Sequence, residues 1–154
     1  MTPATKELEA AGVEFGVHTF EGESDLHDIG RVAADQLGFD PDQVFKTLLV
    51  AAGDDFVVAV VPVSTTLSLK AVAAAVGSKR VEMADQADAE RVTGYVRGGI
   101  SPFGQRRRLP TLLDETAFGF DEIFVSGGRR GLDIGLAPAD LVRVLDATVV
   151  DIGS

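Results

Sequence analysis

The sequence predicts one α+β domain of 154 residues with a mixed β-sheet. Apolar segments typical of strands alternate irregularly with segments of helical periodicity, and no regular strand–helix–strand repeat is present. Hydrophobic residues make up 45% of the chain and charged residues 25%, which is ordinary for a globular domain. The longest strongly apolar stretch, 56–63, is far shorter than the roughly 20 residues that span a bilayer.

A capped helix is expected at the start of the chain. Thr2 supplies a side-chain cap before Pro3 at the first helical position, so the helix should run to about residue 11 and end at Gly12. Apolar residues then alternate over 15–19, which predicts a short strand. A loop is expected over 21–26.

The next elements are a second helix and a hairpin. Asp28 is expected to cap a helix that ends at Gly38, followed by a turn over 40–42. Strands over 44–51 and 56–62 flank a turn-forming segment, which predicts a β-hairpin. The second of these strands is apolar on both faces, so we expect it to be central and covered on two sides.

Two further helices are predicted together with the residues that end them. The apolar segment 69–76 should end at Gly77, and Asp85 should cap a helix that ends at Gly94. The segment 81–83, between these helices, predicts a short strand. The last third of the chain is predicted to contain one helix, begun by Pro138 and running to residue 145, and strands over 109–113, 122–125, 132–136 and 147–152.

The sequence contains no cysteine and only two histidines, His18 and His27. Disulfides, zinc–thiolate sites, iron–sulfur clusters and a cysteine nucleophile are therefore excluded, and we expect neither a metal nor a cofactor. The first residues lack the apolar core of a signal peptide, so we expect a cytoplasmic protein that acts away from membranes.

The formal net charge of −10 argues against a general DNA- or RNA-coating protein, because such binding depends on neutralising phosphates. The charge is unevenly distributed: residues 79–130 hold 9 basic against 8 acidic side chains, whereas residues 1–78 hold 4 against 12. A local anion-binding face on an acidic body and a solvated surface with chance clusters both fit this pattern.

Lys46 lies within an apolar strand, where lysine is seldom buried without a partner. An anionic or polar partner in a cleft explains this position, and so does a strand-edge lysine that reaches water. Two glycine-rich segments, 98–104 and 125–133, are candidate walls for such a cleft. Gly98 and Gly99 let backbone N–H groups approach a phosphate or an oxyanion, although plain turn geometry explains them as well.

Two polar residues, Ser126 and Asp133, flank the second glycine segment. Both are candidate ligand-binding side chains, and Asp133 is also a candidate partner for an amine or for Lys46. The alternative for both is turn chemistry on a solvated strand face. A Ser-His-Asp triad with His18 or His27 is conceivable, but the G-x-S-x-G elbow is absent.

Several segments resemble the YbaK/EbsC aminoacyl-tRNA editing family, and in particular its YbaK-type Cys-tRNA(Pro) deacylases. They occur in one order along nearly the whole chain: MTPA (1–4), DQVFKTLLV (42–50), VEMAD (81–85), TGY (93–95), GGISP (98–102), RLPT (108–111) and VSGG with DI (125–134). The resemblance implies a single domain over 1–154, with a mixed, mostly antiparallel sheet or distorted barrel and surrounding helices. It also implies an enzyme that hydrolyses misacylated Cys-tRNA(Pro).

By similarity to this family, Lys46 and Gly98 are the expected catalytic residues. Lys46 would engage the terminal adenosine and ester end of the aminoacyl-tRNA, and the Gly98 backbone would line the reacting carbonyl. Family members often carry tyrosine where this chain has Phe20 and phenylalanine where it has Ile29, so one hydroxyl and one ring are missing here. The expected substrate-binding residues are Phe20, Ile29, Thr47, Gly99, Ile100, Ser101, Ser126 and Asp133.

The resemblance further implies that the thiol of the substrate attacks its own ester and that prolyl-tRNA synthetase is a partner. Cysteine and proline are similar in size, and one methylene yields only ~1–3 kcal/mol of discrimination, so a proline pocket accepts cysteine. A free thiol has a pKa of about 8.5, so part of it is thiolate near neutrality. Two alternatives remain: a related deacylase with another amino-acid specificity, and a non-catalytic module that binds tRNA ends or a synthetase.

Overall fold

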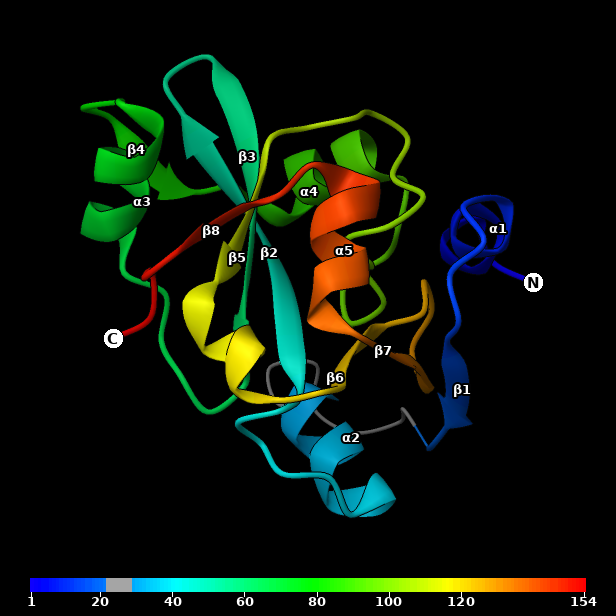
Figure 1. The fold of residues 1–154 in the computed structure, drawn as a ribbon. Helices are drawn as coiled ribbons and strands as arrows, with labels where there is room; N and C mark the ends of the chain where they lie inside the picture. The colour runs from blue at the N-terminus through cyan, green and yellow to red at the C-terminus, as the bar shows by residue number, and fades with distance from the viewer. Residues whose placement is uncertain (22–28) are drawn as a thin grey trace.

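Two β-sheets and five α-helices make up the described part of the fold (Figure 1). The structure, a computed structural model, describes residues 1–21 and 29–154, with the backbone alone for residues 29–32. In chain order the elements are α1 (Pro3–Ala10), β1 (Gly16–Thr19), α2 (Ile29–Leu37), β2 (Phe45–Ala52), β3 (Asp55–Pro62), α3 (Leu69–Val76), β4 (Val81–Met83), α4 (Gln86–Thr93), β5 (Thr111–Asp114), the 3-10 helix η2 (Glu115–Gly119), β6 (Ile123–Ser126), β7 (Leu132–Leu136), α5 (Pro138–Leu145) and β8 (Thr148–Val150).

The larger sheet has five strands in the order β4-β2-β3-β5-β8. β2 and β3 form the predicted hairpin, with Phe45 opposite Pro62 and Ala52 opposite Asp55. β4 pairs with β2 in antiparallel orientation, whereas β5 joins β3, and β8 joins β5, in parallel. β3 is therefore central, and its residues 57–62 are buried, as their apolar character predicted.

The smaller sheet is antiparallel, with three strands in the order β1-β7-β6. The two sheets meet at the start of β2, where an isolated parallel bridge joins Val44 to Phe124 and the Phe124 N–H donates to the Gln43 carbonyl at 3.0 Å. The predicted α+β class with mostly antiparallel pairing is confirmed. The strands are divided between two sheets, however, and neither sheet closes into a barrel among the described strands.

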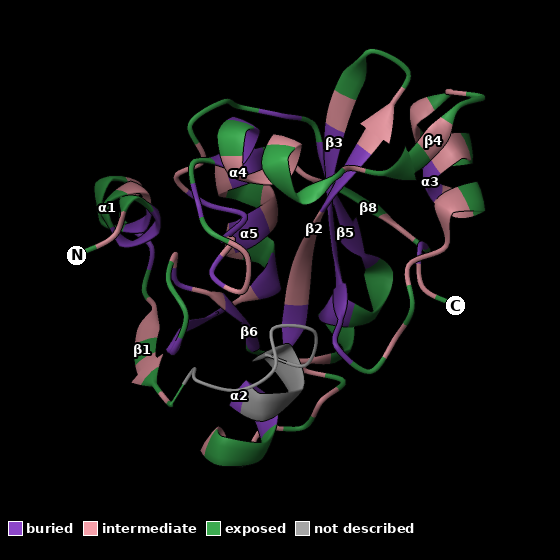
Figure 2. Cartoon of the chain, turned by 180° about the vertical axis from the view of Figure 1, so that it is seen from behind, coloured by how far each residue is buried: buried purple, intermediate pink, exposed green. Residues whose placement is uncertain are grey.

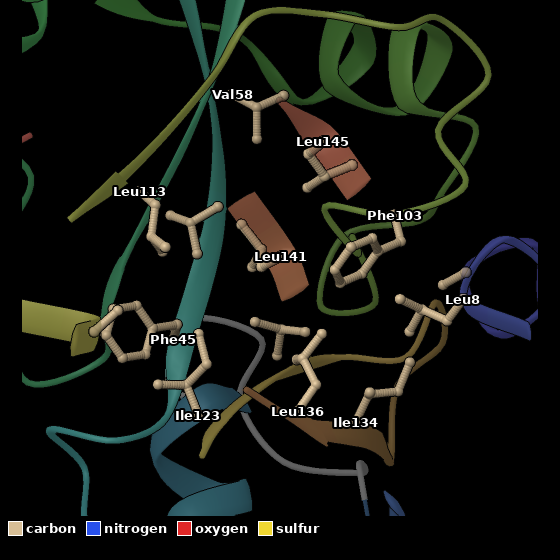
Figure 3. Close-up of a cluster of buried hydrophobic side chains, with 14 of the residues drawn as sticks. Leu8, Phe45, Val58, Phe103, Leu113, Ile123, Ile134, Leu136, Leu141 and Leu145 are labelled. Atoms are coloured by element: carbon tan, nitrogen blue, oxygen red, sulfur yellow. The ribbon is translucent and has the colours of Figure 1, made fainter. Parts of the chain in front are cut away.

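The main hydrophobic core lies where the two sheets and α5 face one another (Figure 3). Leu141 and Leu145 of α5 point into it, and Phe45 of β2 and the loop residue Phe103 belong to the same cluster. A second cluster, which includes Val72 of α3, covers the other face of the larger sheet. Buried residues accordingly concentrate in the strands and on the inward sides of the helices (Figure 2). Each fully buried leucine or phenylalanine contributes about 1.5–3 kcal/mol.

The helix ends follow the capping residues predicted from the sequence. The Thr2 side chain accepts from the Thr5 N–H at 3.2 Å, and the Asp85 carboxylate accepts from the Asp88 N–H at 2.8 Å. Gly77 and Gly94 adopt left-handed conformations with φ of 70° and 82° and end α3 and α4. These predicted helix boundaries are confirmed.

The strand expected over 109–113 begins two residues later, at Thr111. Pro110 has no N–H to donate to a ladder, so it contributes only its carbonyl, which accepts from the Val58 N–H at 2.9 Å. The short 3-10 helix Glu115–Gly119, which follows β5, was not predicted.

The closing strand expected over 147–152 is shorter in the structure, where β8 covers Thr148–Val150. The buried carboxylate of Asp114 accepts from the N–H groups of Ile152 and Gly153 at 3.0 and 3.1 Å. These two N–H groups therefore bond to a side chain instead of extending the ladder.

The predicted loop over 21–26, the cap at Asp28 and the candidate His27 fall outside the described residues, except for Glu21. Among the residues that are described, no helix is long and apolar enough to cross a membrane.

Candidate active site

Three polar side chains lie in one row across the smaller sheet. Asp133 of β7 pairs with Ser126 of β6 on one side and with His18 of β1 on the other. Residues opposite one another on antiparallel strands point to the same face of the sheet. The three side chains therefore share the face that lies opposite the one carrying the core residue Ile134.

Lys46 extends this row from the larger sheet. The bridge between Val44 and Phe124 sets β2 beside β6. Lys46 and Ser126 each follow the bridge by two residues, so they lie on the same side of their strands as the bridged pair. The lysine is half-buried in the hairpin, opposite Val61. The order of the row is Lys46, Ser126, Asp133 and His18.

Aromatic rings occupy the His18 end of the row. The rings of Phe39 and Phe124 stack with centroids 3.7 Å apart, and the His18 imidazole meets them edge-on at 5.2 and 5.5 Å. No hydrogen bond within the described residues joins the side chains of His18, Asp133 and Ser126. They therefore lack the connected relay that a Ser-His-Asp triad needs.

Asp133 is the buried ionisable group of the row. The residue is 6% exposed, and no described residue donates a hydrogen bond to its carboxylate. Burial disfavours the charged form and raises the pKa of Asp133 to about 7. Near neutral pH this carboxyl group is therefore present in both protonated and ionised forms. No group of three or more histidine, aspartate or glutamate side chains among the described residues is arranged to hold a metal ion.

The two glycine-rich segments are in contact. A Cβ atom on Gly99 would lie 2.7 Å from the Arg129 Cα, so only glycine permits this approach. The Gly99 N–H donates to the Val96 carbonyl at 2.9 Å and is occupied by the turn. Gly98 has a φ of 85°, and its N–H donates to no acceptor in the described part of the chain. Of these two N–H groups, only that of Gly98 is without an acceptor among the described residues.

The turn between β6 and β7 uses its own amides to close the hairpin. The Gly127 N–H donates to the Leu132 carbonyl at 2.7 Å, and the Gly128 N–H donates to the Ser126 hydroxyl at 3.2 Å. The Thr2 hydroxyl donates to the Gly127 carbonyl. Two N–H groups of this turn are therefore already hydrogen-bonded within the turn. The turn supports the first glycine segment through the contact between Arg129 and Gly99.

A methyl group at Gly99 should separate the two glycine segments. Gly99→Ala would place its Cβ against Arg129 backbone atoms, so the backbone must shift, and we expect kcat/KM for ester hydrolysis to fall about 10- to 100-fold. Gly119→Ala is the matched control, since a Cβ there meets nothing within 4 Å. An unchanged kcat/KM in a folded Gly99→Ala variant would contradict the role of this contact.

Other predicted site residues lie outside the row. The Phe20 N–H donates to the Gly131 carbonyl at 2.9 Å, at the edge of the β6–β7 turn. Ile100 is half-buried and packs on the main core. Ser101 is fully buried, and its hydroxyl accepts from the Phe103 N–H at 3.2 Å.

Thr47 and Ile29 complete the predicted set. Strand alternation places the Thr47 side chain on the face of Phe45 and Leu49, opposite to Lys46. Its Oγ1 atom is buried and has no hydrogen-bond partner. Ile29 begins α2, and its side chain is outside the described part of the chain. The individual roles of all these residues in binding stay predictions.

Sequence reasoning missed the residues that hold the glycine segments in place. The Tyr95 hydroxyl donates to the Phe103 carbonyl at 2.6 Å, across the first segment. A Cβ on Gly128 would lie 3.0 Å from the Tyr95 ring and 3.1 Å from the Thr2 side chain. Both residues belong to segments that carried the family resemblance, TGY and MTPA, but no role was assigned to them.

Comparison with known proteins identifies the family to which this fold belongs. Residues 23–144 match the family described as the aminoacyl-tRNA editing domain. The chain belongs to this family. A relative from Enterococcus faecalis, named as the Cys-tRNA(Pro)/Cys-tRNA(Cys) deacylase EbsC, is 37% identical over 98% of this chain and 92% of its own length.

A second relative and a solved structure of similar fold extend the comparison of this editing domain. The Ser/Thr-tRNA deacylase ProXp-y of Escherichia coli is 25% identical over 94% of this chain and 87% of its own length. A crystal structure described as a trans-editing enzyme for prolyl tRNA synthetase has a TM-score of 0.84 at 22% identity, covering 100% of this chain and 99% of that one. The predicted family and enzyme class, one that edits aminoacyl-tRNA, are confirmed.

Proposed function

We propose that this editing domain hydrolyses Cys-tRNA(Pro) in trans, with the thiol of the substrate as nucleophile. The observation that carries the proposal is the half-buried Lys46, which lies in a row with Ser126 and Asp133. The β6–β7 hairpin carries Ser126 and Asp133. Its turn also contacts Gly99 through the Arg129 backbone and so supports the neighbouring Gly98. The 37% identical relative named for Cys-tRNA deacylation supports cysteine as the amino acid.

The proposed reaction needs little from the protein besides positioning and charge. The cysteinyl thiolate attacks the ester carbonyl of the same residue and forms a C–S bond in a four-membered thiolactone. The ester C–O bond breaks, and the terminal ribose oxygen leaves and takes up a proton. Water then opens the thiolactone to free cysteine. The first step is intramolecular, so an oriented substrate gains rate without a protein nucleophile.

Lys46 and Gly98 would supply the charge stabilisation. In the attack on the carbonyl, negative charge develops on the carbonyl oxygen and then on the departing ribose oxygen. The Lys46 ammonium would hold the ester end of the substrate, and the Gly98 N–H would donate to the oxyanion. The protonated form of Asp133 is a candidate donor of a hydrogen bond to the substrate, since its pKa lies near neutrality.

The proposed setting is the cytoplasm, together with prolyl-tRNA synthetase as the enzyme that makes the error. The charge of −10 disfavours extensive contact with RNA, so selection of tRNA(Pro) would come largely from the synthetase partner. A related specificity is the second candidate, because the Escherichia coli relative is named for Ser/Thr-tRNA. Those esters have no thiol, so they would require attack by water.

An ester-hydrolysis panel separates these two candidates. Incubated with this protein, Cys-tRNA(Pro) should lose its amino acid at least tenfold faster than Ser-, Ala- or Pro-tRNA(Pro), because only cysteine carries a thiol. Release of the labelled amino acid measures each rate. S-methylation of the cysteinyl ester should abolish the acceleration. Fast hydrolysis of the methylated ester would refute the thiol mechanism, and equal stability of Cys-tRNA(Pro) with and without protein would refute the activity.

A further inference from the structure

Three arginines lie where the first glycine segment meets the β6–β7 turn: Arg97, Arg129 and Arg130. The Arg130 Nε atom donates to the Arg97 carbonyl at 2.9 Å, directly before Gly98. Arg129 presents its backbone to Gly99. These contacts hold Arg97, Arg129 and Arg130 close to the Gly98 turn.

A fourth arginine, Arg106, lies at the end of α4, the helix that precedes Arg97. The Arg106 side chain lies over Gly94, and its Nη1 atom donates to the Arg91 carbonyl at 3.5 Å. The Arg97 N–H, in turn, donates to the Glu90 carboxylate of the same helix at 2.9 Å. We name this group, Arg97, Arg106, Arg129 and Arg130, the arginine surface.

The four arginines differ in their partners: the Arg97 guanidinium donates to the Gln86 side chain at 3.3 Å, whereas the other three have no acidic partner among the described residues. Arg106, Arg129 and Arg130 are exposed, and none of them forms an ion pair with a described residue. By contrast, Arg91 and Arg108 are paired with Asp88 and Glu7 at 2.8 and 3.9 Å. A chain with a net charge of −10 thus presents a positive surface next to the Gly98 turn.

We infer that the arginine surface binds the phosphodiesters of the RNA acceptor end that leads into the site. This inference rests on the proposed function, since an ester held at Gly98 requires the preceding nucleotides to cross the neighbouring surface. Guanidinium groups match phosphate oxygens with two parallel hydrogen bonds. The acidic remainder of the protein repels RNA, so productive contact must be confined to a surface of this kind.

Binding of an uncharged RNA hairpin tests the inference without any ester turnover. The probe is a fluorescein-labelled acceptor-stem hairpin with a single-stranded CCA end, followed by anisotropy. Arg129→Gln/Arg130→Gln should weaken binding about tenfold. It should also lower the slope of log Kd against log salt concentration by about 1.4 to 1.8, because two phosphate contacts are lost at ~0.7–0.9 each. Arg106→Gln should give about half the change in slope.

Lys79→Gln/Arg80→Gln is the matched control. It also removes two positive charges, but from the turn between α3 and β4, on the side of the molecule away from the β6–β7 turn (Figure 1). We expect this control to bind the hairpin like the unmodified protein. Equal weakening by the control, unchanged binding by the Arg129/Arg130 variant, or equally tight binding of an acidic peptide would overturn the inference. If the double variant does not fold, as judged by circular dichroism, the Arg106→Gln variant tests the inference instead.

The two proposals fail in distinguishable ways. A protein that binds the hairpin through the arginine surface but leaves Cys-tRNA(Pro) intact contradicts only the proposed function. A protein that hydrolyses the ester while all arginine variants bind the hairpin normally contradicts only the inference.

Discussion

Replacing Lys46 with alanine should lower kcat/KM for Cys-tRNA(Pro) hydrolysis by about 100-fold or more. The reason is the loss of a cationic donor at the point where negative charge develops, and one such donor is worth roughly 10²–10³ in rate. Lys46 is half-buried on β2 opposite Val61, so its removal leaves the core in place. Single-turnover rates with labelled Cys-tRNA(Pro) measure the effect.

Lys70→Ala provides the control, because it removes an exposed lysine from α3. Both variants should unfold near the temperature of the unmodified protein. Lys46→Arg keeps the charge but presents a planar guanidinium. Compared with Lys46→Ala, we expect this variant to recover KM for the ester more fully than kcat. Full activity in folded Lys46→Ala protein would remove the assigned role.

The stability of the protein should depend on pH through Asp133. Burial raises the pKa of this carboxyl group to about 7 in the folded state, whereas an unfolded aspartate has a pKa of about 3.9. Between these values the folded state binds more protons than the unfolded state. The free energy of unfolding should therefore fall as the pH rises from about 4 to about 7, and this contribution should level off above that range. The full loss is roughly 4 kcal/mol at about 1.36 kcal/mol per pH unit.

Asp133→Asn isolates this contribution, because the amide has a similar shape and no charge. The variant and the unmodified protein should have similar stability near pH 4, and the variant should be more stable at pH 8. Urea unfolding across this range measures the difference in free energy. Asp121→Asn, which removes an exposed carboxylate, controls for the change in net charge. A stability difference for Asp133→Asn that is independent of pH would contradict the burial argument.

The sequence predicted the local elements well because their signals are local. Thr2, Asp85, Gly77 and Gly94 set helix ends through caps and left-handed conformations, which depend on a few neighbouring residues. The division into two sheets could not be predicted in this way. It depends on which strands pair with one another, for example β1 with β7, and these strands are far apart in the chain.

For the candidate site, the sequence indicated residues but not their arrangement, and their roles stay predictions. Residue types and family resemblance identified Lys46, Gly98 and Asp133, and the structure gives each of them a position. The row with His18 follows from the register of β1 on β7, which sequence alone does not fix. The use of the Gly99 N–H by its own turn likewise depends on backbone geometry. Strand pairing and register are tertiary properties, so they follow from the three-dimensional structure and not from local sequence.

The hydrogen bond from Thr2 to the Gly127 carbonyl has a practical consequence for handling this protein. Any peptide fused ahead of Met1 would emerge beside the β6–β7 turn and close to the arginines. A polyhistidine fusion there would interfere with RNA measurements even if the enzyme folded normally. Ser154 lies on the opposite side of the molecule (Figure 1), so affinity handles for purification belong at that end.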